Sequence, residues 1–308
     1  MLRKYGLVDG KPVQTEQDPA PIWVFIDPDE KERRTLAAEY RIDEHTLASA
    51  LDPDELSRLE FDEGYSALIF KTPKNFMGKG QLLFKVASVG LFLYPERLVV
   101  VMSEDIPLFT GKYFHAVKSI HDAYLKIIAG SIHHYLEHLK VINMITDEIE
   151  AKISVSMENK FLLNLFSLEK SLVYYLNALN SNGYVFEKLK NHGAKMGFGP
   201  EQMAFLDDIV VENSQCYRQS EIHSNILASL MDARVSIVSN NLNILMKELN
   251  AIVVAVMIPT FFTGLGGMSE WSMMTKGMDW RLSYGIFLSA MIALGGVTYI
   301  GVRKLERR

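Results

Sequence analysis

The sequence predicts an α+β membrane protein that has a cytoplasmic α/β domain, a long helical stalk and two C-terminal transmembrane helices. Three observations lead to this fold class. Two runs near the C-terminus, residues 249–268 and 282–302, contain no charged residue. No proline lies between Pro200 and Pro259, so one helix can run unbroken through that stretch. Before residue 115, short β-rich runs alternate with helical ones, which favours a sheet flanked by helices.

The first segment, residues 1–115, is expected to form the α/β domain. A strand over Ile22–Ile26 is followed by a charged helix from Asp29 to about Tyr40. Asp43 is placed to cap the next helix, which ends near residue 51, because a carboxylate at this position accepts from free backbone N–H groups. Three further β-rich runs are separated by turn residues: 65–71, 82–93 and 98–102. The Gly78-Lys79-Gly80 run lacks P-loop spacing and is expected to be a hairpin turn.

Residues 116–200 are expected to form a cytoplasmic helical hairpin that packs on the stalk, residues 201–248. No proline appears from Phe109 to Gly199, and apolar residues recur at helical spacing. Breaks are expected near Asn180–Gly183 and Asn191–Gly199, where asparagine and glycine gather.

The two uncharged runs are expected to cross a membrane. Each has about 20 residues, which is the length that spans a hydrocarbon core of roughly 30 Å. Backbone polar groups cannot stay unpaired in lipid, so both runs should be helical. They are joined by a polar loop, residues 269–281, and followed by a basic tail, residues 303–308.

The basic residues predict the orientation in the membrane. The tail carries four Lys or Arg residues, and Lys247 precedes the first span, whereas the loop balances Lys276 and Arg281 against Glu270 and Asp279. The positive-inside rule therefore places the N- and C-termini in the cytoplasm. No basic-then-apolar segment opens the chain, so we expect no cleaved signal and a multi-pass protein of the inner membrane.

One face of the long helix is polar, small or flexible. Asp232, Asn243, Asn250, Met257 and Gly264 follow one another at steps of 11, 7, 7 and 7, and the residues one turn away are Met246 and Thr260. Such steps keep residues on one face of a helix that packs against copies of itself, so we expect a symmetric homo-oligomer. The face is either a packed seam with buried amides or the lining of a channel along the symmetry axis, since polar groups within membranes usually face water.

The run Ser239–Met268 resembles the pore helix of the CorA metal-ion transporters. The matching residues are Asn240, Leu242, Asn243, Met246, Lys247, Leu249, Pro259 and Gly264, then Gly267 and Met268 as the first two residues of the family's Gly-Met-Asn signature. Ser269 stands where the family has asparagine. The stretch Pro259–Gly264 is similar to the zinc-transporting branch, ZntB. Residues 21–73 resemble the family's cytoplasmic domain through Trp23, Asp27-Pro28, Arg58, Glu60 and Gly64-Tyr65.

The resemblance implies five copies around an axial pore, embedded in the lipid bilayer. Cations would be collected at the mouth formed by Gly267, Met268, Ser269 and Glu270. They would then pass Gly264, Thr260, Met257, Asn250, Met246 and Asn243.

Three places are candidate metal sites. His134 and His138 are one helical turn apart, a spacing that can hold zinc, or they lie on a solvated helix face. Asp207-Asp208 is expected to begin the stalk helix, where the charge suits the helix dipole; by resemblance, Asp208 matches an inter-subunit cation-sensing carboxylate. Asp232 would form a carboxylate ring in a symmetric oligomer, or a surface salt bridge.

Composition excludes several function classes. A net charge of −5 argues against nucleic-acid binding, and the single cysteine, Cys216, excludes an intramolecular disulfide. We expect neither an enzyme nor a cofactor, because the sequence shows no nucleophile or acid–base constellation. The expected substrate, and possible regulator, is a divalent cation, with Zn²⁺ slightly favoured over Mg²⁺, Co²⁺ or Ni²⁺ by Ser269 and the histidines. The alternative is a non-conducting membrane scaffold or metal sensor.

Overall fold

The computed structural model describes residues 1–74, 82–153, 159–267 and 273–306. The chain forms two compact units, Met1–Met231 and Asp232–Arg308. The predicted turn at residues 78–80 lies outside the described residues.

The first unit is built on a mixed seven-stranded sheet of order β2-β1-β3-β7-β6-β5-β4. Strands β3 and β7 are parallel, and all other neighbours are antiparallel. The strands are β1 (Leu2–Val8), β2 (Lys11–Gln14), β3 (Ile22–Ile26), β4 (Arg58–Asp62), β5 (Tyr65–Pro73), β6 (Val86–Leu93) and β7 (Leu98–Met102). The predicted strands over 22–26, 65–71 and 98–102 are confirmed, whereas β6 begins at Val86 instead of residue 82.

Strands β1, β2 and β4 were not predicted. The β1–β2 hairpin turns at Asp9-Gly10, where both residues have positive φ angles of 49° and 72°. An Asp-Gly pair between two strands is a strong hairpin signal, and it could have located this hairpin. The polar residues of the flanking strands obscured it, since β1 is only half-buried over most of its length.

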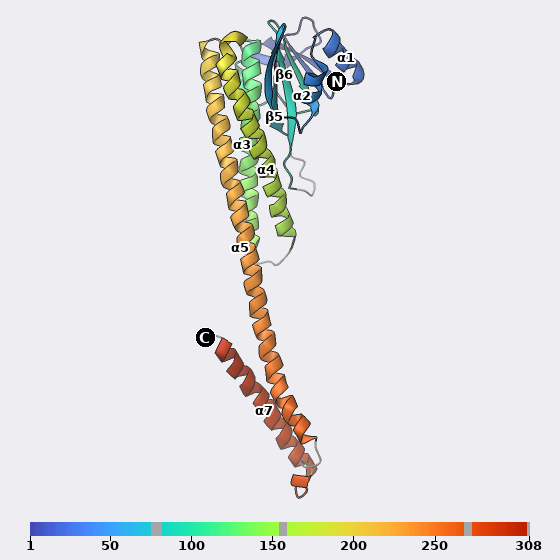
Figure 1. Cartoon of the computed structure of the whole chain (residues 1–308), viewed down its shortest axis with the longest axis vertical. Helices are drawn as coiled ribbons and strands as arrows, with labels where there is room; N and C mark the ends of the chain where they lie inside the picture. Colours follow the sequence, from blue (N-terminus) through green and yellow to red (C-terminus); the bar gives the residue numbers. More distant parts are fainter. Residues whose placement is uncertain (75–81, 154–158, 268–272, 307–308) are drawn as a thin grey trace. The chain divides into compact units, whose positions relative to one another are not determined.

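Helices cover both faces of the sheet (Figure 1). On one face lie α1 (Glu30–Ala38) and α2 (Glu44–Leu51). Asp43 caps α2, as the sequence predicts, and Asp29 caps α1. The opposite face is covered by α3 (Ile120–Ile153) and α4 (Asn159–His192). Because successive strand residues point to opposite faces, each core takes alternate side chains: Leu68 and Phe70 face α3 and α4, while Ala67 and Ile69 face α2.

The predicted helix break near Asn180–Gly183 is wrong, since α4 runs through it without interruption. Asn182 is buried and pairs with the backbone of Lys71 on β5: its Oδ1 accepts from the Lys71 N–H at 2.8 Å, and its Nδ2 donates to the Lys71 carbonyl at 2.8 Å. Asn182 therefore fixes α4 to the sheet instead of ending the helix. The second break is confirmed, because a 3-10 turn, η2 (Gly193–Met196), precedes Gly197 with φ +79°.

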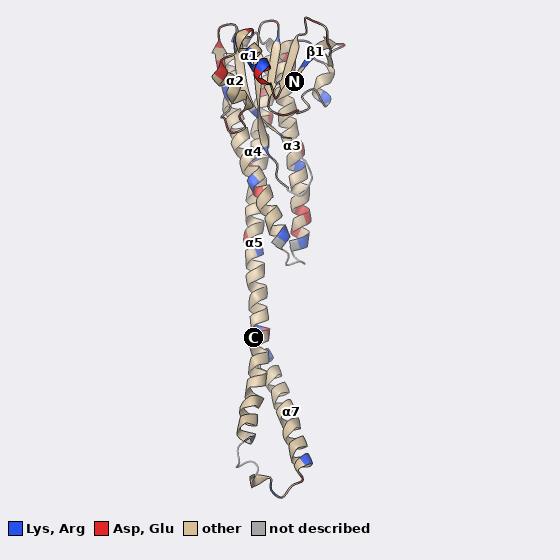
Figure 2. Ribbon diagram, turned by 90° about the vertical axis from the view of Figure 1, so that its right-hand side faces the viewer, with Lys and Arg blue, Asp and Glu red and all other residues tan. Residues whose placement is uncertain are grey.

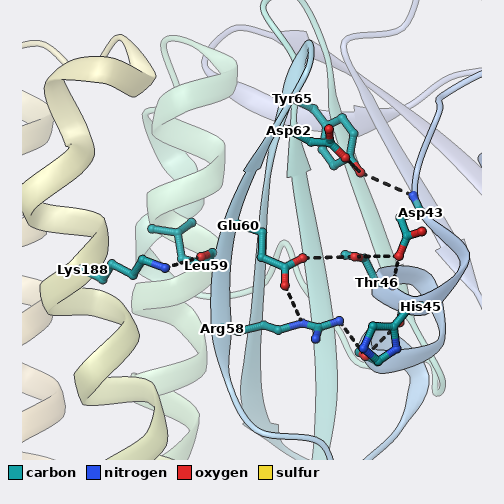
Figure 3. A network of polar contacts seen from close by, with 10 residues as sticks. Asp43, His45, Thr46, Arg58, Leu59, Glu60, Asp62, Tyr65 and Lys188 are labelled. Atoms are coloured by element: carbon teal, nitrogen blue, oxygen red, sulfur yellow. Dashed lines mark hydrogen bonds and ion pairs between the residues drawn. The ribbon is translucent and has the colours of Figure 1, made fainter.

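A polar network joins α2 and α4 to the β4 edge of the sheet (Figure 3). The Glu60 carboxylate accepts from the Thr46 hydroxyl at 3.1 Å and pairs with the Arg58 guanidinium at 3.5 Å. From the other side, the Lys188 ammonium donates to the Leu59 carbonyl at 2.7 Å. The edge strand is thereby held by side chains from elements on both faces.

The longest helix, α5 (Pro200–Gly266), begins in the first unit and ends in the second. The second unit contains its C-terminal part and α7 (Trp280–Glu306). Two helical stretches, Pro200–Leu265 and Trp280–Leu305, are long and apolar enough to cross a membrane. Lys, Arg, Asp and Glu are nearly absent from the end of α5 and from most of α7 (Figure 2).

His138 on α3 is part of the core of the first unit. Its side chain is buried, its Nδ1 lies 2.5 Å from the Tyr175 hydroxyl oxygen, and its ring stacks on the Tyr175 ring. Phe84 contacts the same imidazole edge-on. Burial, and to a lesser extent the neighbouring His134, lowers the pKa of His138 to about 4, so the ring is neutral at physiological pH.

We expect this imidazole to make the first unit acid-sensitive. Because its folded pKa lies below the unfolded value of about 6.5, stability is lost as the pH falls from about 6.5 towards 4, by on the order of 3 kcal/mol. His138→Gln should flatten the fall in unfolding temperature over this range, measured by circular dichroism in detergent. His45→Gln, at an exposed position on α2, is the matched control. An unchanged pH profile in His138→Gln would contradict the assignment.

Candidate ion pathway and metal-binding residues

The predicted polar face of α5 is exposed in the single chain. Asn243, Asn250, Met257 and Gly264 are all solvent-exposed, and Met257 is 68% exposed. Seven residues correspond to nearly two helical turns, so these positions lie almost in line along the helix. The structure therefore brings the predicted pathway residues onto one uncovered surface of one helix.

The groups on this face can interact with a cation in different ways. Asn243 and Asn250 carry amide oxygens, and Met246 and Met257 carry thioethers. The Thr260 hydroxyl donates to the Val256 carbonyl at 2.7 Å, which leaves its oxygen lone pairs available as an acceptor. A Cβ added to Gly264 would meet no atom within 4 Å, so this position leaves open space.

Helix α7 packs against the opposite side of α5. A Cβ added to Gly295 would lie 3.3 Å from the Ala255 carbonyl oxygen and 3.4 Å from Pro259 Cγ. At about 100° per residue, positions 255 and 259 lie about 200° away from Met257. A glycine at such a contact allows two helices in lipid to approach closely. Sequence analysis did not single out Gly295, although a small residue within an apolar span is the available signal.

The mouth residues are described only in part. Gly267 follows α5 directly, and its N–H donates to the Thr263 carbonyl at 3.1 Å. Met268, Ser269 and Glu270 lie outside the described residues.

The three candidate metal sites have different surroundings. Asp232 is exposed and forms no ion pair with any residue that the structure describes. The prediction that Asp207-Asp208 begins the stalk helix is wrong, because α5 starts at Pro200. The two carboxylates therefore lie beyond the first turn of α5. The helix dipole acts most strongly on charges within that first turn. Asp207 instead pairs with Lys190 at 2.9 Å.

His134 and His138 do come together, with ring centroids 4.3 Å apart. Burial lowers the pKa of both imidazoles, which keeps them in the neutral form that binds metals. The nearby His133 forms a separate pair with Glu137 at 3.6 Å. Within the described residues, no group of three or more His, Cys, Asp or Glu side chains is placed to hold one ion.

These features define a membrane protein with an α/β domain and two apolar C-terminal helices, the first of which carries a regular polar face. The family model described as CorA-like Mg²⁺ transporter protein matches residues 20–304. The chain belongs to this family of divalent-cation transporters, as the sequence resemblance implied.

The chain is also similar to known proteins in sequence and in fold. The chain is 24% identical over 263 residues to the cobalt/magnesium transport protein CorA of Methanocaldococcus jannaschii, covering 80% of each chain. The complete structure of that organism's CorA magnesium transporter has a TM-score of 0.70 at 19% identity, covering 100% of this chain and 96% of the other. The ZntB cytoplasmic domain from Vibrio parahaemolyticus has a TM-score of 0.59 at 12% identity, covering 77% of this chain and 98% of the other.

The Gly295 contact generates a prediction for the second unit. Gly295→Leu should push α7 away from α5 and lower the unfolding temperature in detergent, since overpacking typically costs about 1–3 kcal/mol. Gly296→Leu is the matched control, because a Cβ at Gly296 would meet no atom within 4 Å. Equal loss of stability in the two variants would contradict the close α5–α7 approach.

Proposed function

We propose that copies of this chain surround an axial pore lined by α5 and move divalent cations through it. The observation that carries this proposal is the regular polar face of α5, which α7 leaves uncovered. The resemblance to the family gives the number of copies as five. The basic tail, residues 303–308, supports an inner-membrane orientation with both termini in the cytoplasm.

The exposed amides support a ring of copies. Asn250 lies at the start of an apolar stretch, and its side chain is exposed in the single chain. Facing lipid, such a polar group would be unfavourable, whereas facing a water-filled axis it keeps its hydrogen bonds. A symmetric ring turns each of these positions into a ring of identical groups.

The proposed route follows the face of α5. Cations gather at Gly267, Met268, Ser269 and Glu270, where the C-terminal end of the helix is electronegative. They then pass the rings formed by Gly264, Thr260, Met257, Asn250, Met246 and Asn243. Amide and hydroxyl oxygens replace hydration water, and the methionine rings are apolar constrictions that gate by dewetting.

We further propose that cytoplasmic cations regulate the pore. Asp232 would contribute a ring of carboxylates, and Asp208 a carboxylate between neighbouring copies; binding there would stabilise a closed state. The neutral pair His134 and His138 is a possible zinc-binding element, although His138 is already engaged by Tyr175.

The identity of the cation depends on opposing observations. Ser269 replaces the signature asparagine, and this loss of an amide favours Zn²⁺. The oxygen-rich face and the relative named for cobalt and magnesium transport favour Mg²⁺ or Co²⁺. The same serine supports one second candidate function, a non-conducting scaffold or metal sensor that has lost transport along with its signature.

Flux measurements test the proposal. The purified protein in liposomes loaded with a fluorescent indicator is given Zn²⁺, Mg²⁺, Co²⁺ and Ni²⁺ in turn. We expect flux of at least one cation, reduced at least about tenfold in Asn243→Leu, because an apolar ring cannot replace hydration water.

Asn241→Leu is the matched control for this variant. Position 241 lies about 200° from Asn243 around the helix, so flux should be retained. Absence of flux for all four cations, from protein shown to be a folded oligomer, would favour the scaffold or sensor.

A further inference from the structure

The first unit has an open hollow at the N-terminal ends of the parallel strands β3 and β7. Its volume is about 580 Å³, which is within the range of pockets that hold ligands, about 300–1,000 Å³. Three segments form its walls: residues 19–21 before β3, residues 39–40 after α1, and the β6–β7 turn at residues 94–97. Prolines, tyrosines and charged residues line it, and none of them belongs to the predicted ion pathway.

Hydrogen bonds tie the three walls to one another. The Tyr94 hydroxyl donates to the Tyr40 carbonyl at 2.7 Å, which links the β6–β7 turn to the end of α1. The Leu98 N–H, at the start of β7, donates to the Pro21 carbonyl at 2.9 Å. Within the turn, the Tyr94 N–H donates to the Arg97 carbonyl at 2.8 Å. The hollow is therefore preformed, so a ligand loses little affinity to ordering of its walls.

Aromatic and proline rings form the apolar part of the lining. The Tyr40 and Tyr94 rings meet edge-to-face with their centroids 6.1 Å apart, and both side chains are half-buried. Pro19 and Pro95 are exposed beside them. Exposed aromatic rings of this kind are the surface on which proline-rich segments dock in the polyproline II conformation.

Arg97 and Tyr40 leave hydrogen-bond donors available in the hollow. The Arg97 guanidinium carbon lies 4.6 Å from the centre of the Trp23 ring and 5.8 Å from that of the Tyr40 ring. Its Nη1 donates to the Tyr40 hydroxyl at 3.0 Å, and this is the one side-chain hydrogen bond that Arg97 makes among the described residues. The hydroxyl proton of Tyr40 has no acceptor there. A polyproline II backbone has no internal hydrogen bonds, so its carbonyls can accept from these groups.

Two carboxylates give the hollow a negative balance. Glu39 and Glu96 are exposed, and neither forms an ion pair in the part of the chain that the structure describes. Together with Arg97 they give the lining a net charge of −1. The nearby ammonium of Lys4 is paired with Asp18 at 2.8 Å. A basic side chain on the ligand would therefore complement the charge of this surface.

We propose that the hollow binds a proline-rich segment of another protein, in the polyproline II conformation and with a Lys or Arg beside the prolines. The proline rings pack on Tyr40 and Tyr94, and carbonyls of the segment accept from the Tyr40 hydroxyl and the Arg97 guanidinium. The basic residue pairs with Glu39 or Glu96. Because such a segment is already extended before it binds, the complex requires little ordering of either partner.

Fluorescence anisotropy tests this proposal with the full-length protein in detergent. Two dye-labelled peptides are used, Arg-Ala-Leu-Pro-Pro-Leu-Pro and Pro-Pro-Leu-Pro-Pro-Ala-Arg, so that both chain directions are covered. We expect saturable binding of at least one of them. Replacing its prolines by alanine should weaken binding at least about tenfold, because the peptide loses both the ring contacts and the preformed conformation. Replacing its arginine by glutamate should weaken binding about fivefold.

Variants of the protein locate the bound peptide. Tyr40→Phe should weaken binding about three- to tenfold, because it removes one hydrogen-bond donor and keeps the ring. The double variant Glu39→Gln with Glu96→Gln should weaken binding of the arginine peptide about two- to fivefold, and should not affect a peptide with alanine in place of arginine. Tyr184→Phe on α4 and Glu63→Gln in the β4–β5 turn change exposed residues elsewhere and are the matched controls.

Several outcomes overturn the proposal. Saturable binding of neither peptide up to about 1 mM would exclude a site of useful affinity. Equal binding of the alanine-substituted peptide, or displacement of the peptide by spermidine at the same concentration, would assign the hollow to small cations. Unchanged binding in both Tyr40→Phe and the double glutamine variant would place the peptide elsewhere. These measurements report binding without flux, so they are independent of the proposed transport.

Discussion

A helix of 67 residues cannot bury its own surface, and this constraint on α5 shapes the rest of the molecule. In the first unit, α3 and α4 cover it, and residues such as Leu206, Ile209 and Cys216 complete their core. In the second unit, α7 covers only one side, around Ala255 and Pro259. The opposite side remains open in the single chain. The packing along α5 thus separates a stretch that supports the fold of the first unit from a stretch that the single chain leaves uncovered on one side.

Where a helix contacts a neighbouring element, glycine and asparagine residues allow a close approach. Asn182 pairs with both backbone groups of Lys71, at a point on β5 beyond the last residue paired with β4. Gly183 admits the Asn213 amide, and Gly295 admits the backbone of α5. Each residue brings two elements closer than a larger side chain would allow. Local rules interpret the same residues as helix breakers, because those rules consider the chain without its neighbours.

Along the C-terminal part of α5, oxygen donors lie at a regular spacing on one exposed side of the helix. In the proposed ring of copies, symmetry would bring these donors together around the axis. Such an arrangement suits a moving cation, since no single ring holds it firmly.

The sequence by itself determined the two apolar spans, the polar face of α5, the cap at Asp43, and the mixed sheet. These features depend on periodicity, charge and local hydrogen bonding, which neighbouring residues specify. Only the tertiary structure decided that Asn182 holds a helix to the sheet, since its partner is 111 residues away. It also decided that His138 is a neutral core residue, because Tyr175 and Phe84 surround it. Partners distant in sequence set these roles, and no local pattern identifies which distant side chain will arrive.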